Sequence, residues 1–241
     1  VNANYSLSLL DPFNPGTALV SAEGDIPANC FGDALSFVNE TVKQTNAFAS
    51  VISTAANAGN NLSKKWDSLD TDIANKLKNV ARLISGGLQT KIYIVQLGGF
   101  DTHDNQVVIG ETGTGLHSDL LKQLSDAICA FQDDLNLLNV HDRVVGMTYS
   151  EFGRRIRSNA AYGTDHGTAA PLLLFGSCIQ NQILGDHPEI DTQVGIDEGV
   201  AMQYDFRDIY GTILKDWLGL KESEAQNVIH PEIKALPLFK E

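Results

Sequence analysis

The chain has few cysteines and few positive charges, and each shortage excludes a class of protein. Its 3 cysteines are widely spaced and form no CxxC pair, which argues against a structural zinc ribbon. One disulfide with a free thiol and three buried thiols are both compatible with this spacing. Lys and Arg number 17 against 30 Asp and Glu, giving a net charge of −13. Such a surface repels phosphate backbones, so we expect no nucleic-acid partner.

Several sequence signatures are also missing. No apolar run reaches the ~18 residues of a membrane span, and no GxxxxGK[ST] motif indicates a P-loop. No GxSxG elbow indicates an α/β-hydrolase. The opening VNANYSLSLLDP lacks the basic and long apolar regions of a signal peptide, so we expect a protein that stays inside the cell or has lost its leader. A hydrophobic content of 43% nevertheless predicts a globular chain with a substantial core.

The N-terminal third is expected to be irregular and then helical. Residues 1–30 are rich in Pro, Gly and Asn, which is typical of irregular structure. Apolar residues then recur every three or four positions over 31–58, where NAGNN ends the predicted helix. A second helix is predicted over 62–84, ending at Gly86. We expect these two helices to form an antiparallel pair.

Beyond residue 90 the pattern changes to that of an α/β protein. The sequences KIYIVQL (91–97) and RVVGMTY (143–149) predict buried strands, with a helix over 116–138 between them. Such a strand–helix–strand unit is normally parallel and right-handed. LLLFG (172–176) predicts a third strand that returns antiparallel, because the connection before it is short for a crossover with its own helix. A final helix is expected over 206–218, with the tail packed on the body.

Polar clusters at the ends of these strands indicate a metal site. GGFDTH places Asp101 and His103 directly after the first strand, and DHG places Asp165 and His166 before the third. Ligands of open α/β sheets bind beyond the carboxyl ends of strands, so an antiparallel third strand would bring all four side chains to one edge. Carboxylates and imidazoles are usual ligands of catalytic zinc. The sequence therefore predicts a divalent metal there, zinc before calcium or magnesium. For either motif alone, a loop-capping Asp with a solvated His is the alternative.

The SEFGRR sequence after the second strand supplies two candidate catalytic residues. Arg154 could hold a phosphate or sulfate in a bidentate fork, and Glu151 could be a further metal ligand or a general base. The two could instead form a salt bridge with each other. A cation at this edge would offset the negative field of the protein and allow an anionic ester to bind. The remaining histidines are expected to be ordinary surface or helix-end residues: His117, His141, His187 and His230.

The order of these motifs resembles the domain-of-unknown-function family 1501. The resemblance covers about residues 91–239 and rests on GGFDTHDNQ, LLKQLSDAICAFQDDL, DRVVGMTYSEFGRRIRSNAAYGTDHGTAAPLLLFG and DFRDIYGTILKDWLG. Residues 1–90 resemble only the variable segment of that family, which is grouped with the alkaline phosphatase and sulfatase superfamily. The resemblance implies an α/β fold with an alkaline-phosphatase-like sheet sandwiched by helices. It also implies hydrolysis of a small anionic phosphate or sulfate ester, and a periplasmic or extracellular location after twin-arginine export.

Two departures from the superfamily pattern shape the expectation. The superfamily pattern assigns Asp101, His103 and His166 to one metal, but MTYSEFG places Ser150 and Glu151 where ligands of a second metal are expected. The Ser or Thr nucleophile of the superfamily lies on an N-terminal strand that residues 1–90 do not show.

We therefore expect an incomplete fold, in which N-terminal strands are missing and a separate N-terminal half is a partner. Within this chain, residues 1–90 and 91–241 are expected to form one domain together. A non-catalytic secreted structural or binding protein with the same fold is the alternative function, and a calcium-type structural site is a third.

Overall fold

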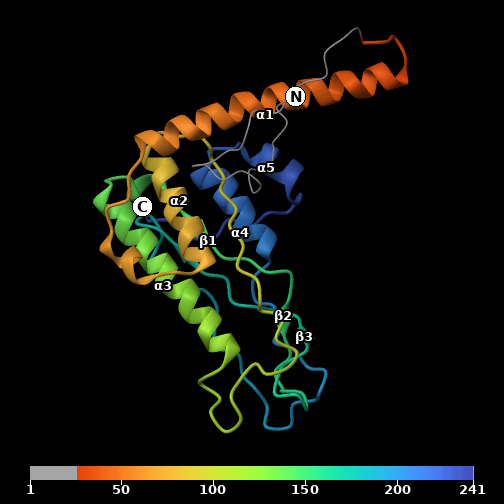
Figure 1. Ribbon diagram of the computed structural model, residues 1–241. Helices are drawn as coiled ribbons and strands as arrows, with labels where there is room; N and C mark the ends of the chain where they lie inside the picture. The colour runs from red at the N-terminus through yellow and green to blue at the C-terminus, as the bar shows by residue number, and fades with distance from the viewer. Residues whose placement is uncertain (1–25, 241) are drawn as a thin grey trace. The chain divides into compact units, whose positions relative to one another are not determined.

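The computed structural model describes residues 26–240, which divide into two compact units (Figure 1). The first comprises the described part of 1–98 together with 122–140, and the second comprises 99–121 together with the described part of 141–241. The chain passes between the units three times, after residues 98, 121 and 140, and the first of these points lies beyond residue 90, where the sequence pattern changes. Helix α3 (Leu116–Leu137) confirms the predicted helix at that position and contributes residues to both units. Most of the segment predicted to be irregular, 1–30, lies outside the described residues.

Helix α1 (Cys30–Ala58) confirms the first predicted helix. The Asn29 side chain caps its start by accepting a hydrogen bond from the Gly32 N–H at 3.0 Å. The helix ends at Gly59, within the NAGNN sequence. Among the described residues, its last turns join the core of the first unit, where an apolar cluster forms from Ile52, Ala55, Ala56 and Leu83.

The second predicted helix is broken into two elements. A 3-10 turn, η2 (Lys64–Ser68), precedes α2 (Asp72–Ser85), and Ser63 and Thr71 each accept an N-cap hydrogen bond. Two separate caps start two separate elements, which explains the break. The predicted antiparallel pairing with α1 is wrong, because the helices meet at their C-terminal ends (Figure 1). A Cβ added to Gly59 or Gly86 would lie 1.9 Å from a carbonyl oxygen of the other helix, so glycine permits this close contact.

A buried carboxylate ties the α1–α2 connection to α3. Asp134 is fully buried. Its Oδ1 accepts hydrogen bonds from the Leu62 and Ser63 N–H groups at 2.6 and 2.9 Å. Its Oδ2 accepts from Asn61 Nδ2 at 2.7 Å and Trp66 Nε1 at 2.8 Å. Four donors satisfy the carboxylate, so it can be buried without a cation beside it.

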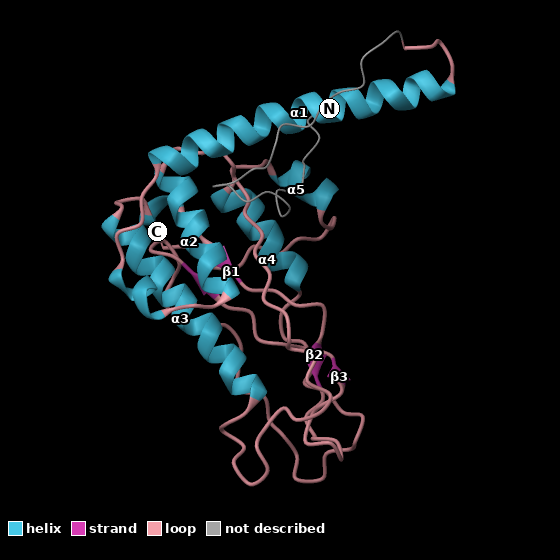
Figure 2. Ribbon diagram, in the orientation of Figure 1, coloured by secondary structure: helices cyan, strands magenta, loops and turns pink. Residues whose placement is uncertain are grey.

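The strands differ most from the prediction. KIYIVQL (91–97) forms no strand with any described residue, and RVVGMTY contributes only β1 (Gly146–Met147). β1 pairs antiparallel with β4 (Leu174–Phe175), which confirms the predicted antiparallel return. A strand requires a neighbouring backbone with which it can hydrogen-bond, and 91–97 has no such partner among residues 26–240. The predicted parallel strand–helix–strand unit is therefore absent from the described residues. Figure 2 shows that helices and loops dominate the described chain. The alkaline-phosphatase-like sheet stays a prediction.

A second two-stranded sheet carries site residues. β2 (Gly153–Arg154) pairs antiparallel with β3 (His166–Gly167), and Arg154 stands opposite His166. A Cβ on Gly167 would lie 2.3 Å from the Arg154 carbonyl carbon, so the two backbones are too close for a side chain at 167. The register of this short sheet therefore fixes one loop of the candidate site.

The C-terminal region contains the predicted helix over 206–218 and one helix, α5 (Glu222–Val228), that was not predicted. A 3-10 turn, η3 (His141–Arg143), precedes β1. Helix α4 (Phe206–Thr212) continues as the π-helical turn η4 (Ile213–Trp217) and stops before Gly219, whose φ is 75°. Helix α5 (Glu222–Val228) follows. The Phe239 ring stacks on Trp217 at 5.9 Å, and Leu238 is buried, so the tail packs on the body as expected.

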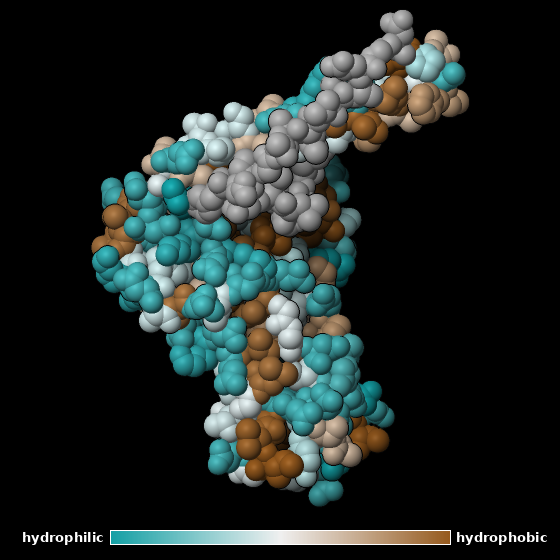
Figure 3. All heavy atoms as spheres, in the orientation of Figure 1, coloured by the Kyte–Doolittle hydropathy of each residue, from teal (hydrophilic) through white to brown (hydrophobic). Residues whose placement is uncertain are grey.

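All three cysteines are free thiols. Cys30 and Cys129 are exposed, and Cys178 is half-buried. The structure therefore agrees neither with a disulfide nor with three buried thiols. Apolar side chains also reach the surface, and Figure 3 shows hydrophobic residues in separate groups among hydrophilic ones. Within residues 26–240, no helix combines the length and apolar character needed to cross a membrane.

We predict that Asp134→Asn lowers the free energy of unfolding by about 2–4 kcal/mol, because the new amide group would point a donor at existing donors. Urea denaturation followed by circular dichroism measures this change. Asp126→Asn on the exposed face of α3 is the matched control, since within residues 26–240 Asp126 forms an ion pair only with Lys122, at the surface. We expect that control to change stability by less than about 0.5 kcal/mol. Equal effects of the two substitutions would contradict the role assigned to Asp134.

Candidate metal centre

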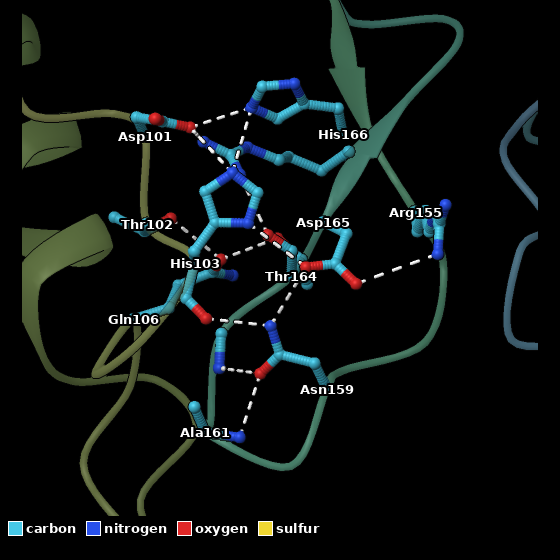
Figure 4. A network of polar contacts seen from close by, with 12 residues as sticks. Asp101, Thr102, His103, Gln106, Arg155, Asn159, Ala161, Thr164, Asp165 and His166 are labelled. Carbon is cyan, nitrogen blue, oxygen red and sulfur yellow. Dashed lines mark hydrogen bonds and ion pairs between the residues drawn. The ribbon is translucent and has the colours of Figure 1, made fainter.

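Two loops of the second unit bring the predicted metal residues together (Figure 4). Asp101 and His103 lie on the loop after Gly99, and Asp165 and His166 lie at the end of the loop that joins β2 to β3. Main-chain hydrogen bonds of 3.0–3.2 Å connect the loops: Asn105 N to Ala161 O, Gln106 N to Tyr162 O, and Thr164 N to Thr102 O. The predicted convergence of these two sequence motifs is therefore confirmed.

Three donor atoms form a candidate metal-binding triad: Asp101 Oδ1, His103 Nε2 and His166 Nε2. The carboxylate oxygen lies 3.2 Å from the His103 nitrogen and 2.9 Å from the His166 nitrogen. The two nitrogens are 3.0 Å apart. A tetrahedral zinc ion with bonds of about 2.0–2.1 Å separates its ligands by about 3.3–3.4 Å. Small side-chain movements would therefore bring the triad to the spacing that such an ion requires.

Asp165 orients His103 and is not part of the triad. Its Oδ1 lies 3.1 Å from His103 Nδ1. A carboxylate only accepts hydrogen bonds, so Nδ1 carries the proton and Nε2 presents its lone pair towards the other two donors. Asn159 supports this arrangement, since its Nδ2 donates to the His103 carbonyl at 2.7 Å and to Asp165 Oδ1 at 3.2 Å. The sequence predicted Asp165 as a metal ligand, and the structure instead makes it the hydrogen-bond partner of His103, a candidate ligand.

Both carboxyl groups are favoured in the ionised form. The hydrogen bond from His166 lowers the pKa of Asp101 from its ordinary value, and the Arg154 guanidinium lowers it further. The hydrogen bond from His103 lowers the pKa of Asp165, followed in effect by that from Asn159. At neutral pH the site therefore presents carboxylates, which is the form that binds cations.

Arg154 fastens the two loops to each other. Its Nη1 donates to the Thr164 carbonyl at 2.8 Å, and its Nη2 donates to the Phe100 carbonyl at 2.6 Å and to Asp101 Oδ1 at 2.8 Å. The Arg154 side chain is only 20% exposed. These contacts favour a positioning role over the predicted anion fork. The alternative salt bridge to Glu151 does not form within residues 26–240.

Phe152 supports the second imidazole and was missed by the sequence analysis. Its ring stacks on the His166 ring at 3.7 Å between centroids, with 25° between the planes. Phe152 lies two residues before Arg154, which stands opposite His166, but this register comes from the β2–β3 pairing and no local sequence pattern indicated it. Stacking therefore holds one imidazole, while a hydrogen bond to Asp165 holds the other.

Gln106 is a further residue that sequence reasoning missed. Its Oε1 accepts hydrogen bonds from Thr102 Oγ1 at 2.8 Å and from Thr164 Oγ1 at 2.7 Å. Both threonines are buried, and each belongs to a different site loop. This shared acceptor provides a second link between the loops, beside Arg154.

Glu151 and the other histidines lie outside the triad. Glu151 is exposed and makes no hydrogen bond or ion pair with another described residue, so its catalytic role stays a prediction. Ser150 Oγ donates to the Phe152 carbonyl at 2.9 Å. Four histidines take no part in the triad, as expected: His117, His141, His187 and His230.

A family model described as "Protein of unknown function (DUF1501)" matches residues 47–224. The match takes in both site loops and all four predicted metal residues. It begins within α1 and therefore extends further towards the N-terminus than the resemblance drawn from the motifs. No curated protein and no solved structure matches the chain.

We predict that Arg154→Lys loosens both site loops, because a single ammonium group cannot reach three acceptors on two loops. Hydrogen exchange at the Gln106 and Thr164 amides, which bond across the loops, should accelerate about tenfold or more. Arg157→Lys is the matched control, since among the described residues Arg157 donates a hydrogen bond only to the Val194 carbonyl, at 3.3 Å. Unchanged exchange in Arg154→Lys would show that the other interloop bonds suffice.

Proposed function

This chain belongs to the DUF1501 family of proteins of unknown function, and for this member we propose a metal-dependent function in which Asp101, His103 and His166 hold one divalent ion. The observation that carries the proposal is the convergence of these three donor atoms within 3.2 Å of one another. Zinc is the favoured ion, because two imidazole nitrogens and one carboxylate suit it, whereas calcium and magnesium prefer oxygen ligands. Three protein ligands also leave a coordination position open.

The proposed reaction is hydrolysis of a small phosphate or sulfate ester, as in the alkaline phosphatase and sulfatase superfamily. A bound divalent ion would supply positive charge and Lewis acidity at a site where the net charge of −13 otherwise repels an anion. The protein's own contribution is to hold the donors: Asp165 fixes the His103 tautomer, and Arg154 fixes Asp101. The resemblance further supports export to the periplasm or beyond.

A specific observation favours the non-catalytic alternative, a secreted metal-binding structural or binding protein. The nearby hydroxyl groups already serve as hydrogen-bond donors within the protein. Thr102 and Thr164 donate to Gln106, and Ser150 donates to a main-chain carbonyl. Among the described residues of this network, none offers an unengaged hydroxyl nucleophile. Hydrolysis would therefore depend on water or on a group outside this network.

We predict that zinc binds with one ion per chain and that His103→Ala weakens the affinity at least a hundredfold, because it removes one of three ligands. Isothermal titration calorimetry at neutral pH measures both quantities. Asp165→Ala should weaken binding about 10–100-fold, because the tautomer of His103 is then no longer fixed. His187→Ala, an exposed histidine elsewhere, is the control. Wild-type affinity in His103→Ala would refute the proposed site.

A separate prediction concerns catalysis. The zinc-loaded chain should hydrolyse 4-nitrophenyl phosphate or 4-nitrophenyl sulfate, and His103→Ala should reduce the rate to that of the uncatalysed reaction. Release of 4-nitrophenolate, followed by its absorbance, measures both rates. Zinc binding without hydrolysis of either ester would favour the non-catalytic alternative for this chain.

A further inference from the structure

The spacing of the three donor atoms in the triad indicates the geometry of the ion that they would hold. Neighbouring ligands of a six-coordinate ion lie at right angles, and bonds of about 2.1 Å then separate them by about 3.0 Å. In a tetrahedral ion, bonds of the same length separate the ligands by about 3.4 Å. The measured separations among Asp101 Oδ1, His103 Nε2 and His166 Nε2 are 2.9, 3.0 and 3.2 Å. The triad therefore fits the right-angled arrangement, whereas a tetrahedral ion would push the three atoms apart.

Each donor is also held by a contact that an ion would leave in place. The Nδ1 atom of His103 lies 3.1 Å from a carboxylate oxygen behind the ring. The His166 ring stacks on Phe152 at 3.7 Å between centroids, and its backbone belongs to the β2–β3 sheet. Arg154 Nη2 donates to Asp101 Oδ1 at 2.8 Å. These supports oppose widening of the triad. Because zinc has no geometric preference of its own, the protein sets the coordination.

We propose that the triad occupies one face of a six-coordinate ion and that its ligand is a small anion that chelates the ion through two oxygens. This inference rests on the proposed metal site and adds the coordination number and the class of ligand. Two imidazoles and one carboxylate on one face also form the protein ligands of non-haem iron oxygenases, where the other positions are open. The three remaining positions of the octahedron are adjacent to one another. A tetrahedral ion on the same triad would offer a single position.

Adjacent positions select ligands by the arrangement of their oxygens. An anion with oxygens on neighbouring atoms, such as a 2-hydroxy acid, can occupy two of these positions at once. Its second bond forms within the same complex, which raises the affinity above that of a single oxygen. The net charge of −13 disfavours anions that would bind without such a bond to the cation. An ester substrate of this site would therefore carry a second oxygen donor beside its phosphate or sulfate group.

Cobalt(II) in place of zinc tests the coordination number, because four-coordinate Co²⁺ absorbs visible light far more strongly than six-coordinate Co²⁺. After free ion is removed, elemental analysis should find one cobalt per chain, with visible bands about tenfold weaker than those of a tetrahedral site. His103→Ala should lose the cobalt, and His187→Ala, at an exposed histidine elsewhere, should keep it.

The outcomes of this experiment separate the inference from the proposed function. Bound cobalt with the intense bands of a four-coordinate ion, or the intermediate bands of a five-coordinate ion, would overturn the inference and leave the metal site standing. Failure to retain cobalt would also overturn it. Failure to retain zinc as well would overturn the metal site itself.

Glycolate and acetate test the class of ligand on the cobalt-loaded chain. Both are singly charged carboxylates of similar size, but glycolate can close a chelate ring through its hydroxyl group. Isothermal titration calorimetry should give an affinity for glycolate about tenfold higher than that for acetate. The metal-free chain is the control and should bind neither anion. Equal affinities of the cobalt-loaded chain for the two anions, or binding of glycolate to the metal-free chain, would refute the chelating ligand.

Discussion

The guanidinium of Arg154 is the contact on which the site depends, because it bonds both loops at once. Its three short hydrogen bonds reach a carbonyl on each loop and the carboxylate of Asp101. The planar group can satisfy acceptors in several directions, which an ammonium group on a flexible stem cannot do. The β2–β3 register sets Arg154 opposite His166. One side chain thus connects the β2–β3 sheet, the loop that carries Asp101 and His103, and the loop that leads to His166. These connections help to set the positions of all three donor atoms.

Without an ion, the triad already has the hydrogen-bonding pattern that an ion would replace. His103 presents a lone pair at Nε2, since its proton is held at Nδ1 by Asp165. His166 Nε2 lies 2.9 Å from Asp101 and 3.0 Å from His103, so the proton between these acceptors belongs to His166. A cation at the centre would take the place of that proton. A neutral His166 imidazole would then carry its proton at Nδ1, so the ring would stay neutral while the surrounding framework stays in place.

Local signals in the sequence were sufficient for most helices and for the triad. Donors that sit two residues apart in DTH, or beside a glycine in DHG, lie on short loops, as predicted. The predicted reason for their convergence was wrong, because 91–97 pairs with no described strand, and main-chain hydrogen bonds and Arg154 join the loops instead. The break before α2 was readable from Ser63 and Thr71, but apolar spacing alone concealed it. The sequence could not show that 91–97 would form no strand with the described residues, because pairing depends on a neighbouring backbone that no local pattern specifies. The role of Arg154 was equally hidden, since two of its acceptors are main-chain carbonyls.

The triad is exposed to solvent, and this affects how an ion would bind and dissociate. The side chains of Asp101, His103 and His166 are 67%, 45% and 46% exposed. Since solvent reaches all three, no segment would have to open before a chelator could strip the ion. The fraction of sites that hold an ion would then follow the free-metal concentration of the surroundings without a slow opening step. An ion bound at such a site would exchange with the surroundings, in contrast to ions that are trapped permanently during folding.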